Sequence, residues 1–218
     1  MGYNIAIDGP ASAGKSTIAK LVAKKKGFIY VDTGAMYRAM SVFFMNKNVN
    51  ADNVEEIESI CKDADVKIVY ENEAQQVLLN GENITMKLRE ESVGNMASKT
   101  ATIPGVRAHL LDLQKNLAKD FDVVMDGRDI GTNILPNADL KIYLTASVDA
   151  RANRRFKELS EKGMNCDLEA IASDIAERDY RDMNREIAPL KQATDAILVD
   201  SSNMTIEEVV ETILGACN

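Results

Sequence analysis

Near the start of the chain, a glycine-rich segment runs directly into a lysine and two hydroxyl residues. The segment is Gly9, Pro10, Ala11, Ser12, Ala13, Gly14, Lys15, Ser16 and Thr17, and it fits the pattern G-x-x-x-x-G-K-[S/T]. An apolar run at 5–8 predicts a buried strand before it, and residues 15–26 predict a helix after it. Glycines let several main-chain N–H groups turn toward one anion, and the helix N-terminus adds partial positive charge. We predict a nucleoside triphosphate site, with Lys15 on the outer phosphates and Ser16 on Mg²⁺.

Acidic residues end four of the expected strands. They are Asp8, Asp32, Asp126 and Asp200. Ligands of open α/β sheets lie at the carboxyl ends of the strands, so Asp126 is the best candidate for the magnesium shell. A helix cap or turn former is the alternative, above all for Asp8 and Asp200. Residues 126–129, D-G-R-D, gather a cation and two anions at one strand end, which fits an anionic, hydrogen-bonding substrate better than a solvated turn.

Two sets of arginines recur at helical spacing. They are Arg151, Arg154 and Arg155, then Arg178, Arg181 and Arg185. Solvated pairs such as Glu177–Arg181 and Arg178–Asp182 are the alternative explanation for the second set. Because the sets flank a polar break at 161–165 in an acidic chain with a phosphate loop, they favour a lid. Such a lid would close arginines over a transferring phosphoryl group and exclude water.

Strands and helices are expected to alternate along the chain. Apolar runs predict strands at 3–8, 28–32, 123–126, 140–144 and 196–200. Helical patterns occupy 15–26, a stretch from 33, 53–62, 93–119 with a break at 103–105, 148–186 with a break at Gly163, and 206–214. This alternation predicts a parallel sheet covered by helices on both faces. Two apolar runs at 66–70 and 76–79, with turns at 71–73 and 80–81, predict a small antiparallel meander, and a surface hairpin is the simpler alternative.

Composition excludes several classes of function. The net charge of −8 and the absence of tryptophan argue against nucleic-acid or acidic-membrane binding. No run approaches the ~20 apolar residues of a membrane span, and the N-terminus leaves no room for a signal peptide. Cys61, Cys166 and Cys217 form no C-x-x-C pair, which predicts free thiols in the cytoplasm. The single histidine, His109, is expected to have a packing or surface role. One histidine is too few for a metal cluster, and this argues against a histidine-dependent triad.

Four segments, in order, resemble the bacterial cytidylate kinase family, and the likeness covers essentially the whole chain. They are I-D-G-P…G-K-S-T at 7–17, D-T-G-A-M-Y-R at 32–38, D-G-R-D-I-G-T at 126–132 and R-D…R-D…R…A-P-L at 178–190. The first is common among NTPases, and the others are more specific. The resemblance implies an α/β, three-layer P-loop NTPase fold with a five-stranded parallel sheet between helices. It also implies a single domain over 1–218, an inserted antiparallel nucleotide-binding segment at about 64–92, a helical lid at about 151–185, and a monomer.

The resemblance also implies a role for each matching residue. ATP and Mg²⁺ are the implied cofactors, with the loop 9–17 and the lid arginines, Arg151, Arg154 and Arg155, on the triphosphate side, and Ser16 and Asp126 on the metal. CMP or dCMP is the implied substrate, contacted by Thr33, Arg38, Ser98, Arg107, Arg128, Asp129, Arg178, Asp182 and Arg185. Lys15, Arg128, Arg178 and Arg185 are the implied catalytic residues. Ser12 departs from the family, which often has glycine there.

The implied reaction is in-line transfer of the γ-phosphoryl group to a phosphate that is already an anion, so no general base is required. A carboxylate beside a guanidinium complements cytosine and leaves a group unpaired against uracil. Other phosphate-loop kinases, for UMP, AMP or shikimate, are the nearest alternative. A GTPase-like switch is a second, but the chain has no N-K-x-D motif. An architectural protein with a vestigial loop would leave Lys15-Ser16-Thr17 unexplained.

Overall fold

The computed structural model describes residues 2–71 and 74–217 and consists of two compact units. The sheet unit comprises Gly2–Tyr30 and Phe121–Asn218, and the intervening unit comprises Val31–Asp120. Part of the turn predicted at 71–73, residues 72–73, lies outside the described residues. Each unit is described by itself.

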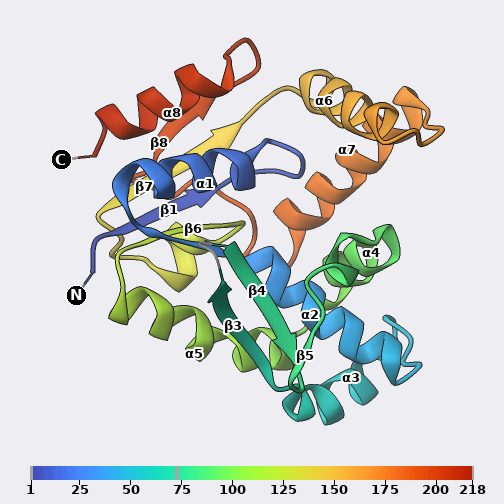
Figure 1. Cartoon of the computed structure of the whole chain (residues 1–218). Helices are drawn as coiled ribbons and strands as arrows, with labels where there is room; N and C mark the ends of the chain where they lie inside the picture. The colour runs from blue at the N-terminus through green and yellow to red at the C-terminus, as the bar shows by residue number, and fades with distance from the viewer. Residues whose placement is uncertain (1, 72–73, 218) are drawn as a thin grey trace. The chain divides into compact units, whose positions relative to one another are not determined.

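A five-stranded parallel sheet carries the fold (Figure 1). Its order is β2-β6-β1-β7-β8. The strands are β1 (Asn4–Asp8), β2 (Ile29–Asp32), β6 (Val123–Gly127), β7 (Leu140–Thr145) and β8 (Ile197–Asp200). In the centre, Asp8 of β1 lies opposite Gly127 of β6 and Tyr143 of β7. The central strands read as continuous apolar runs because both of their faces are buried.

Helices α1 (Lys15–Lys26) and α8 (Ile206–Gly215) lie side by side and share a core with the sheet (Figure 1). Ile18 and Val22 of α1 and Ile213 of α8 pack with Ile7 of β1 and Ile142 of β7, all almost fully buried. This apolar layer fixes the strand that precedes the phosphate loop and the helix that follows it. The loop therefore spans two elements that the core holds in place.

Helices α6 (Val148–Glu161) and α7 (Leu168–Asn184) form a helical hairpin in the sheet unit. The Ser147 side chain accepts a hydrogen bond from the N–H of Ala150 and caps the start of α6. The hairpin turns near Gly163, which has a φ of 73°. The predicted helical stretch and its break are thus confirmed.

The intervening unit combines helices with a small second sheet. It holds α2 (Thr33–Asn46), α3 (Val54–Ile60), α4 (Glu91–Thr100) and α5 (Pro104–Asp120), together with β3 (Val66–Glu71), β4 (Ala74–Leu79) and β5 (Glu82–Asn83). Strands β3, β4 and β5 are antiparallel neighbours in that order. Because Val77 and Leu79 are buried and the strands contact α2, the segment is the predicted meander and more than a surface hairpin.

The expected fold class is confirmed, since the parallel sheet is flanked by helices and a three-stranded antiparallel sheet is added (Figure 1). Among the described residues, no helix is long and apolar enough to cross a membrane. The sequence did not predict the π-helical turn η3 (Ile130–Ile134) or the short 3₁₀ helices η1 (Cys61–Asp63) and η2 (Lys87–Arg89). The turn η3 depends on a carboxylate from β1, which local sequence does not reveal.

Gly27 ends α1 in the left-handed conformation, with a φ of 71°. A Cβ there would meet no atom within 4 Å, so Gly27→Ala carries only the backbone cost. We expect a loss of about 1 kcal/mol in unfolding free energy, measured by urea denaturation. Gly215→Ala is the matched control, because Gly215 also has open space but lacks a positive φ. Equal effects of the two substitutions would contradict this account.

Candidate functional site

The loop between β1 and α1 has a main chain that only certain residues can follow. Gly9 has a φ of 154°, and a Cβ on it would lie 1.9 Å from the carbonyl oxygen of Leu144, so no side chain fits. Ser12 has a φ of 58°, and Gly14, the N-cap of α1, has a φ of 85°. Ser12 therefore adopts a conformation that glycine reaches at lower cost, which explains why glycine suits that position.

Lys15 is buried at the base of this loop. Its Nζ donates hydrogen bonds to the carbonyl oxygens of Gly9 (2.7 Å) and Pro10 (2.6 Å). Burial, followed by the charge of Arg128, lowers the pKa of Lys15 to about 7. An ammonium group with so little solvent is stabilised by a neighbouring anion. The geometry thus suits Lys15 to a phosphate held by the loop.

Ser16 and Asp126 meet at the carboxyl end of β6. The Ser16 hydroxyl donates to Asp126 Oδ2 and the Tyr30 hydroxyl to Asp126 Oδ1, each at 2.9 Å. A hydroxyl and a carboxylate are hard oxygen ligands of the kind Mg²⁺ prefers. No group of three or more His, Cys, Asp or Glu residues could hold a metal in the described part of the chain. A magnesium ion here would take its remaining ligands from phosphate oxygens and water.

Two ion pairs join the D-G-R-D segment to the end of α7. Arg128 Nε donates to Asp182 Oδ2 at 2.7 Å, and Arg185 Nη2 donates to Asp129 Oδ1 at 3.0 Å. Burial alone would raise the pKa of Asp182, but the hydrogen bond and charge of Arg128, together with the charges of Arg185 and Lys15, hold that pKa below its usual range. The sheet unit therefore brings four of the predicted substrate residues together, two arginines that are each paired with an aspartate.

The remaining arginines of the two helices are engaged within the sheet unit. Arg154 contacts Ser201, Arg155 pairs with Glu158 at 2.9 Å, and Arg178 lies 3.9 Å from Asp174. Of the two pairs considered from spacing, Glu177–Arg181 is formed at 2.7 Å, whereas Asp182 pairs with Arg128. The contacts of Arg154 and Arg155 with ATP stay predictions.

The other predicted substrate residues belong to the intervening unit. Thr33 begins α2 and is buried, and Ser98 lies half-buried on α4. A Cβ on Gly34 would lie 3.1 Å from Nη1 of Arg38, so the glycine leaves room for that guanidinium. Arg107 donates to the Ala101 carbonyl at 3.2 Å, and its guanidinium lies 5.7 Å from the ring centre of Tyr37. These four residues occupy α2, α4 and α5, which contact one another through α2.

Asp8 has a structural role that its strand-end position only partly suggested. Its two oxygens accept hydrogen bonds from the N–H groups of Ile130 (2.8 Å) and Gly131 (2.7 Å). Burial, partly offset by these bonds, raises the pKa of Asp8 to about 6. Asp8 therefore caps the π-helical turn that follows the D-G-R-D segment, as the turn-former alternative implied.

Two further residues of the site were missed by sequence reasoning. Tyr30 donates its hydroxyl to Asp126, although nothing in an apolar strand pattern marks it as a partner. Asp179 accepts a hydrogen bond from the N–H of Ala11 in the phosphate loop at 3.0 Å. Its position in the R-D pair at 178–179 was the available signal.

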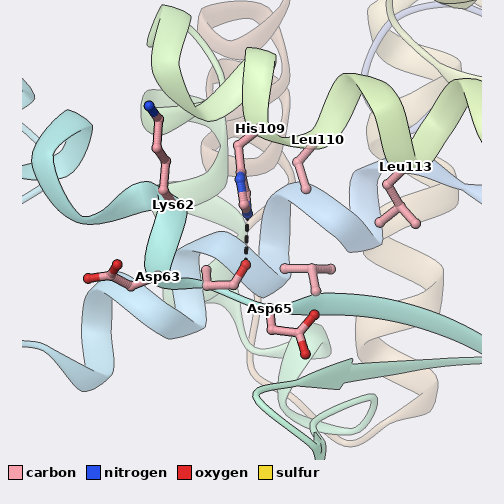
Figure 2. A pocket seen from close by; sticks show the side chains of 8 residues that line it. Lys62, Asp63, Asp65, His109, Leu110 and Leu113 are labelled. Atoms are coloured by element: carbon pink, nitrogen blue, oxygen red, sulfur yellow. Dashed lines mark hydrogen bonds between the residues drawn. The ribbon is translucent and has the colours of Figure 1, made fainter.

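A cavity of about 260 Å³ in the intervening unit is lined by none of the predicted site residues; Figure 2 shows its lining. It is lined by Lys62, Asp63, Ala64, Asp65, Val66, His109, Leu110 and Leu113. The Nε2 atom of His109 is hydrogen-bonded to the Ala64 carbonyl at 2.7 Å (Figure 2). That contact joins α5 to the segment before β3, which supports the packing role expected of His109.

Comparisons with known proteins agree along the whole chain. A family model described as cytidylate kinase matches residues 5–218. The cytidylate kinase of Caldicellulosiruptor saccharolyticus is 52% identical over 211 residues, which cover 97% of this chain and 93% of that protein. The cytidylate kinase of Bacillus subtilis is 44% identical over 213 residues, covering 98% and 95%.

Among solved structures, the resemblance concerns the fold alone. A gluconokinase from Sinorhizobium meliloti superposes with a TM-score of 0.51 at 12% identity, covering 99% of this chain and 91% of that one. This structural likeness supports the α/β fold described above.

Asp8 predicts a specific pH dependence of stability. Its folded pKa of about 6 exceeds the ordinary 3.8, so the folded state binds the proton more tightly. The stability that Asp8 contributes is therefore full below its ordinary pKa and is lost as pH rises through about 6. Relative to Asp8→Asn, the wild type should lose on the order of 3 kcal/mol across that range. Urea unfolding at several pH values measures this difference, and parallel profiles would contradict it.

Proposed function

The chain belongs to the cytidylate kinase family, and we propose that it transfers the γ-phosphoryl group of ATP to CMP or dCMP with the help of Mg²⁺. Membership favours a cytidylate acceptor over UMP, AMP and shikimate, and a kinase over a GTPase-like switch. The products are then ADP and CDP or dCDP. The expectation that this chain is a phosphotransferase is confirmed by the family match.

The phosphate loop with its buried lysine is the observation that carries the proposal. Lys15, held against the carbonyls of Gly9 and Pro10, would turn to the β- and γ-phosphates when a nucleotide enters. The N-terminus of α1 adds main-chain donors to the same anion. Together they would bind the triphosphate and match the charge that grows on its oxygens during transfer.

Ser16 and Asp126 would hold Mg²⁺, directly or through water. Their 2.9 Å contact puts two oxygen ligands side by side next to the loop. When bound, the ion neutralises phosphate charge and aligns the transferred group. Tyr30 would keep Asp126 oriented for this purpose through its own hydrogen bond.

Arg128, Arg178 and Arg185 would act on the acceptor and the transferring group. Arg185 already lies in a buried pair with Asp129 and Arg128 in a partly buried pair with Asp182, so their positions need little rearrangement. Guanidinium groups suit phosphate oxygens because their fork of donors matches two acceptors. The acceptor phosphate is itself the nucleophile, so catalysis rests on alignment and charge.

Asp129 would read the cytosine base. Its carboxylate can accept from the exocyclic amino group of cytosine, while uracil presents an acceptor there. Arg107 and Ser98 of the intervening unit are assigned to the same base, Arg38 to the acceptor phosphate and Thr33 to the substrate. Asp182 and Arg178 are assigned to the sugar. A mismatched base would leave a buried polar group unpaired, which is how such a pocket rejects uracil.

Four broader features complete the proposal. We propose that the meander β3–β5 belongs to a nucleotide-binding insert at about 64–92, and that α6 and α7 form a lid at about 151–185. The cysteines Cys61, Cys166 and Cys217 are free, which supports a cytoplasmic setting. We propose a monomer that needs only small-molecule partners.

The direct test is an ADP-release assay with ATP and each of CMP, dCMP, UMP, AMP and shikimate. We expect turnover with CMP or dCMP that exceeds the other acceptors by at least about tenfold in kcat/KM, because the base is read by paired polar groups. Equal rates with UMP would reject the acceptor assignment. No ADP release with any acceptor would reject the kinase proposal.

Lys15→Ala should fold but lose turnover by about a thousandfold, because its charge is needed as the phosphoryl group transfers. Circular dichroism checks the fold and the ADP-release assay measures kcat. Lys24→Ala, an exposed position on the same helix, is the control and should leave kcat unchanged. A near wild-type kcat for Lys15→Ala would remove the loop lysine from the mechanism.

Asp129→Ala should impair the use of CMP far more than that of ATP. We expect kcat/KM for CMP to fall by about a hundredfold or more, since Arg185 also loses its buried partner. The KM for ATP should change by less than about threefold, because the phosphate loop contacts are intact. Steady-state kinetics with each substrate varied in turn measures both, and equal losses would show that the base pocket is misassigned.

A further inference from the structure

Ala11 of the phosphate loop is held through both of its main-chain groups by one buried ion pair. Its N–H donates to Oδ1 of Asp179 at 3.0 Å, and its carbonyl accepts from Nη1 of Arg151 at 2.8 Å. The same Nη1 lies 2.6 Å from Oδ2 of Asp179, which closes the ring. The side chains of Arg151 and Asp179 are only 5% and 10% exposed, so this clamp works away from water.

The clamp sets the direction of two consecutive peptide groups in the loop. No peptide bond in the described chain is cis, so the N–H and C=O of each group point in opposite directions. In the Pro10–Ala11 group, the N–H faces Asp179 and the carbonyl faces Lys15 Nζ. In the Ala11–Ser12 group, the carbonyl faces Arg151, so the Ser12 N–H points away from it.

These two peptide groups lie directly before the residue of the loop with the least favourable backbone conformation. Ser12 has the left-handed φ of 58° that a residue with a Cβ rarely adopts unaided. Bonds to the preceding carbonyl and amide restrain the main chain on the approach to Ser12. The Arg151–Asp179 pair suits this restraint, because charge-assisted hydrogen bonds are stronger than those between neutral groups.

Arg151 and Asp179 also attach the helical hairpin to the loop. Arg151 lies near the start of α6, Asp179 lies in the second half of α7, and Arg151 Nε further donates to the Ala146 carbonyl at 2.8 Å. The ends of the hairpin nearest the sheet strands are thus fastened to Ala11. Arg154 of α6 and Arg178 of α7, both assigned to the reaction, are carried by the same fastened helices.

We propose that the Arg151–Asp179 pair is a positioning pair for ATP, which keeps the phosphate loop in its nucleotide-binding form through Ala11. The inference rests on the proposed function. It reassigns Arg151, which the spacing grouped with arginines that face the triphosphate. Arg151 acts through the loop, because its guanidinium is engaged by Ala11, Ala146 and Asp179.

The test compares three variants with the wild type: Asp179→Asn, Arg151→Met, and the two combined. Each single change leaves one buried charge without its partner and lowers Tm, whereas the combined change leaves none and should recover part of the loss. Titration calorimetry with MgATP should show at least about tenfold weaker binding in the combined variant. Binding of CMP should weaken by less than about threefold. Arg151→Lys, which keeps the charge but not the fork, should retain more affinity than Arg151→Met.

Glu177→Gln is the matched control, because it breaks an exposed pair with Arg181 on the same helix, α7, without touching the loop. It should bind MgATP as the wild type does. A combined variant that folds and binds MgATP within twofold of wild type would show that the pair is only structural and overturn the proposal. Equal weakening of MgATP and CMP would overturn it too. If the wild type itself bound no MgATP, the proposed function would fail and this inference with it.

Discussion

The buried ammonium group of Lys15, at the start of α1, is the constraint on which the geometry of the sheet unit depends. Lys15 is almost inaccessible to solvent, and its ammonium group is held by two carbonyl oxygens and by the field of nearby carboxylates. A charge in such a place is costly unless an anion compensates it. In the proposed function, a phosphate held by the loop and the start of α1 serves as that anion.

The same constraint gives a reason for the arginine–carboxylate pairs of this acidic protein. A net charge of −8 repels nucleotides at long range, so attraction must be built locally. Arg151 and Arg185 each form a buried pair with a carboxylate, and Arg128 forms a partly buried one. Such pairs contribute little net stability, because desolvation offsets the attraction. Their value is geometric, since they fix guanidinium groups before any substrate arrives.

Main-chain geometry and charge are coupled in this site. Gly9 packs directly against the main chain of Leu144 in β7. Because a side chain at Gly9 would collide there, the glycine lets the loop lie against β7. Asp8 fastens the turn after β6, and Asp179 with Arg151 fastens Ala11. Two segments that are distant in sequence, the phosphate loop and the turn after β6, are thus fixed at the carboxyl ends of the strands. Asp8 and Asp179 fix them by accepting hydrogen bonds from main-chain N–H groups, which are strong when a buried carboxylate is the acceptor.

The sequence by itself determined the elements and the chemistry of the loop, because periodicity and G-x-x-x-x-G-K-S are local properties of consecutive residues. Helix α1 was predicted to the residue, and the meander and the break at Gly163 were also recognised. Only the tertiary structure decided which charges meet. Asp182 pairs with Arg128 instead of its helical neighbour Arg178, and Arg151 turns to Ala11. The physical reason is that an ion pair buried between segments far apart in the chain depends on packing, and spacing along one helix carries no record of it.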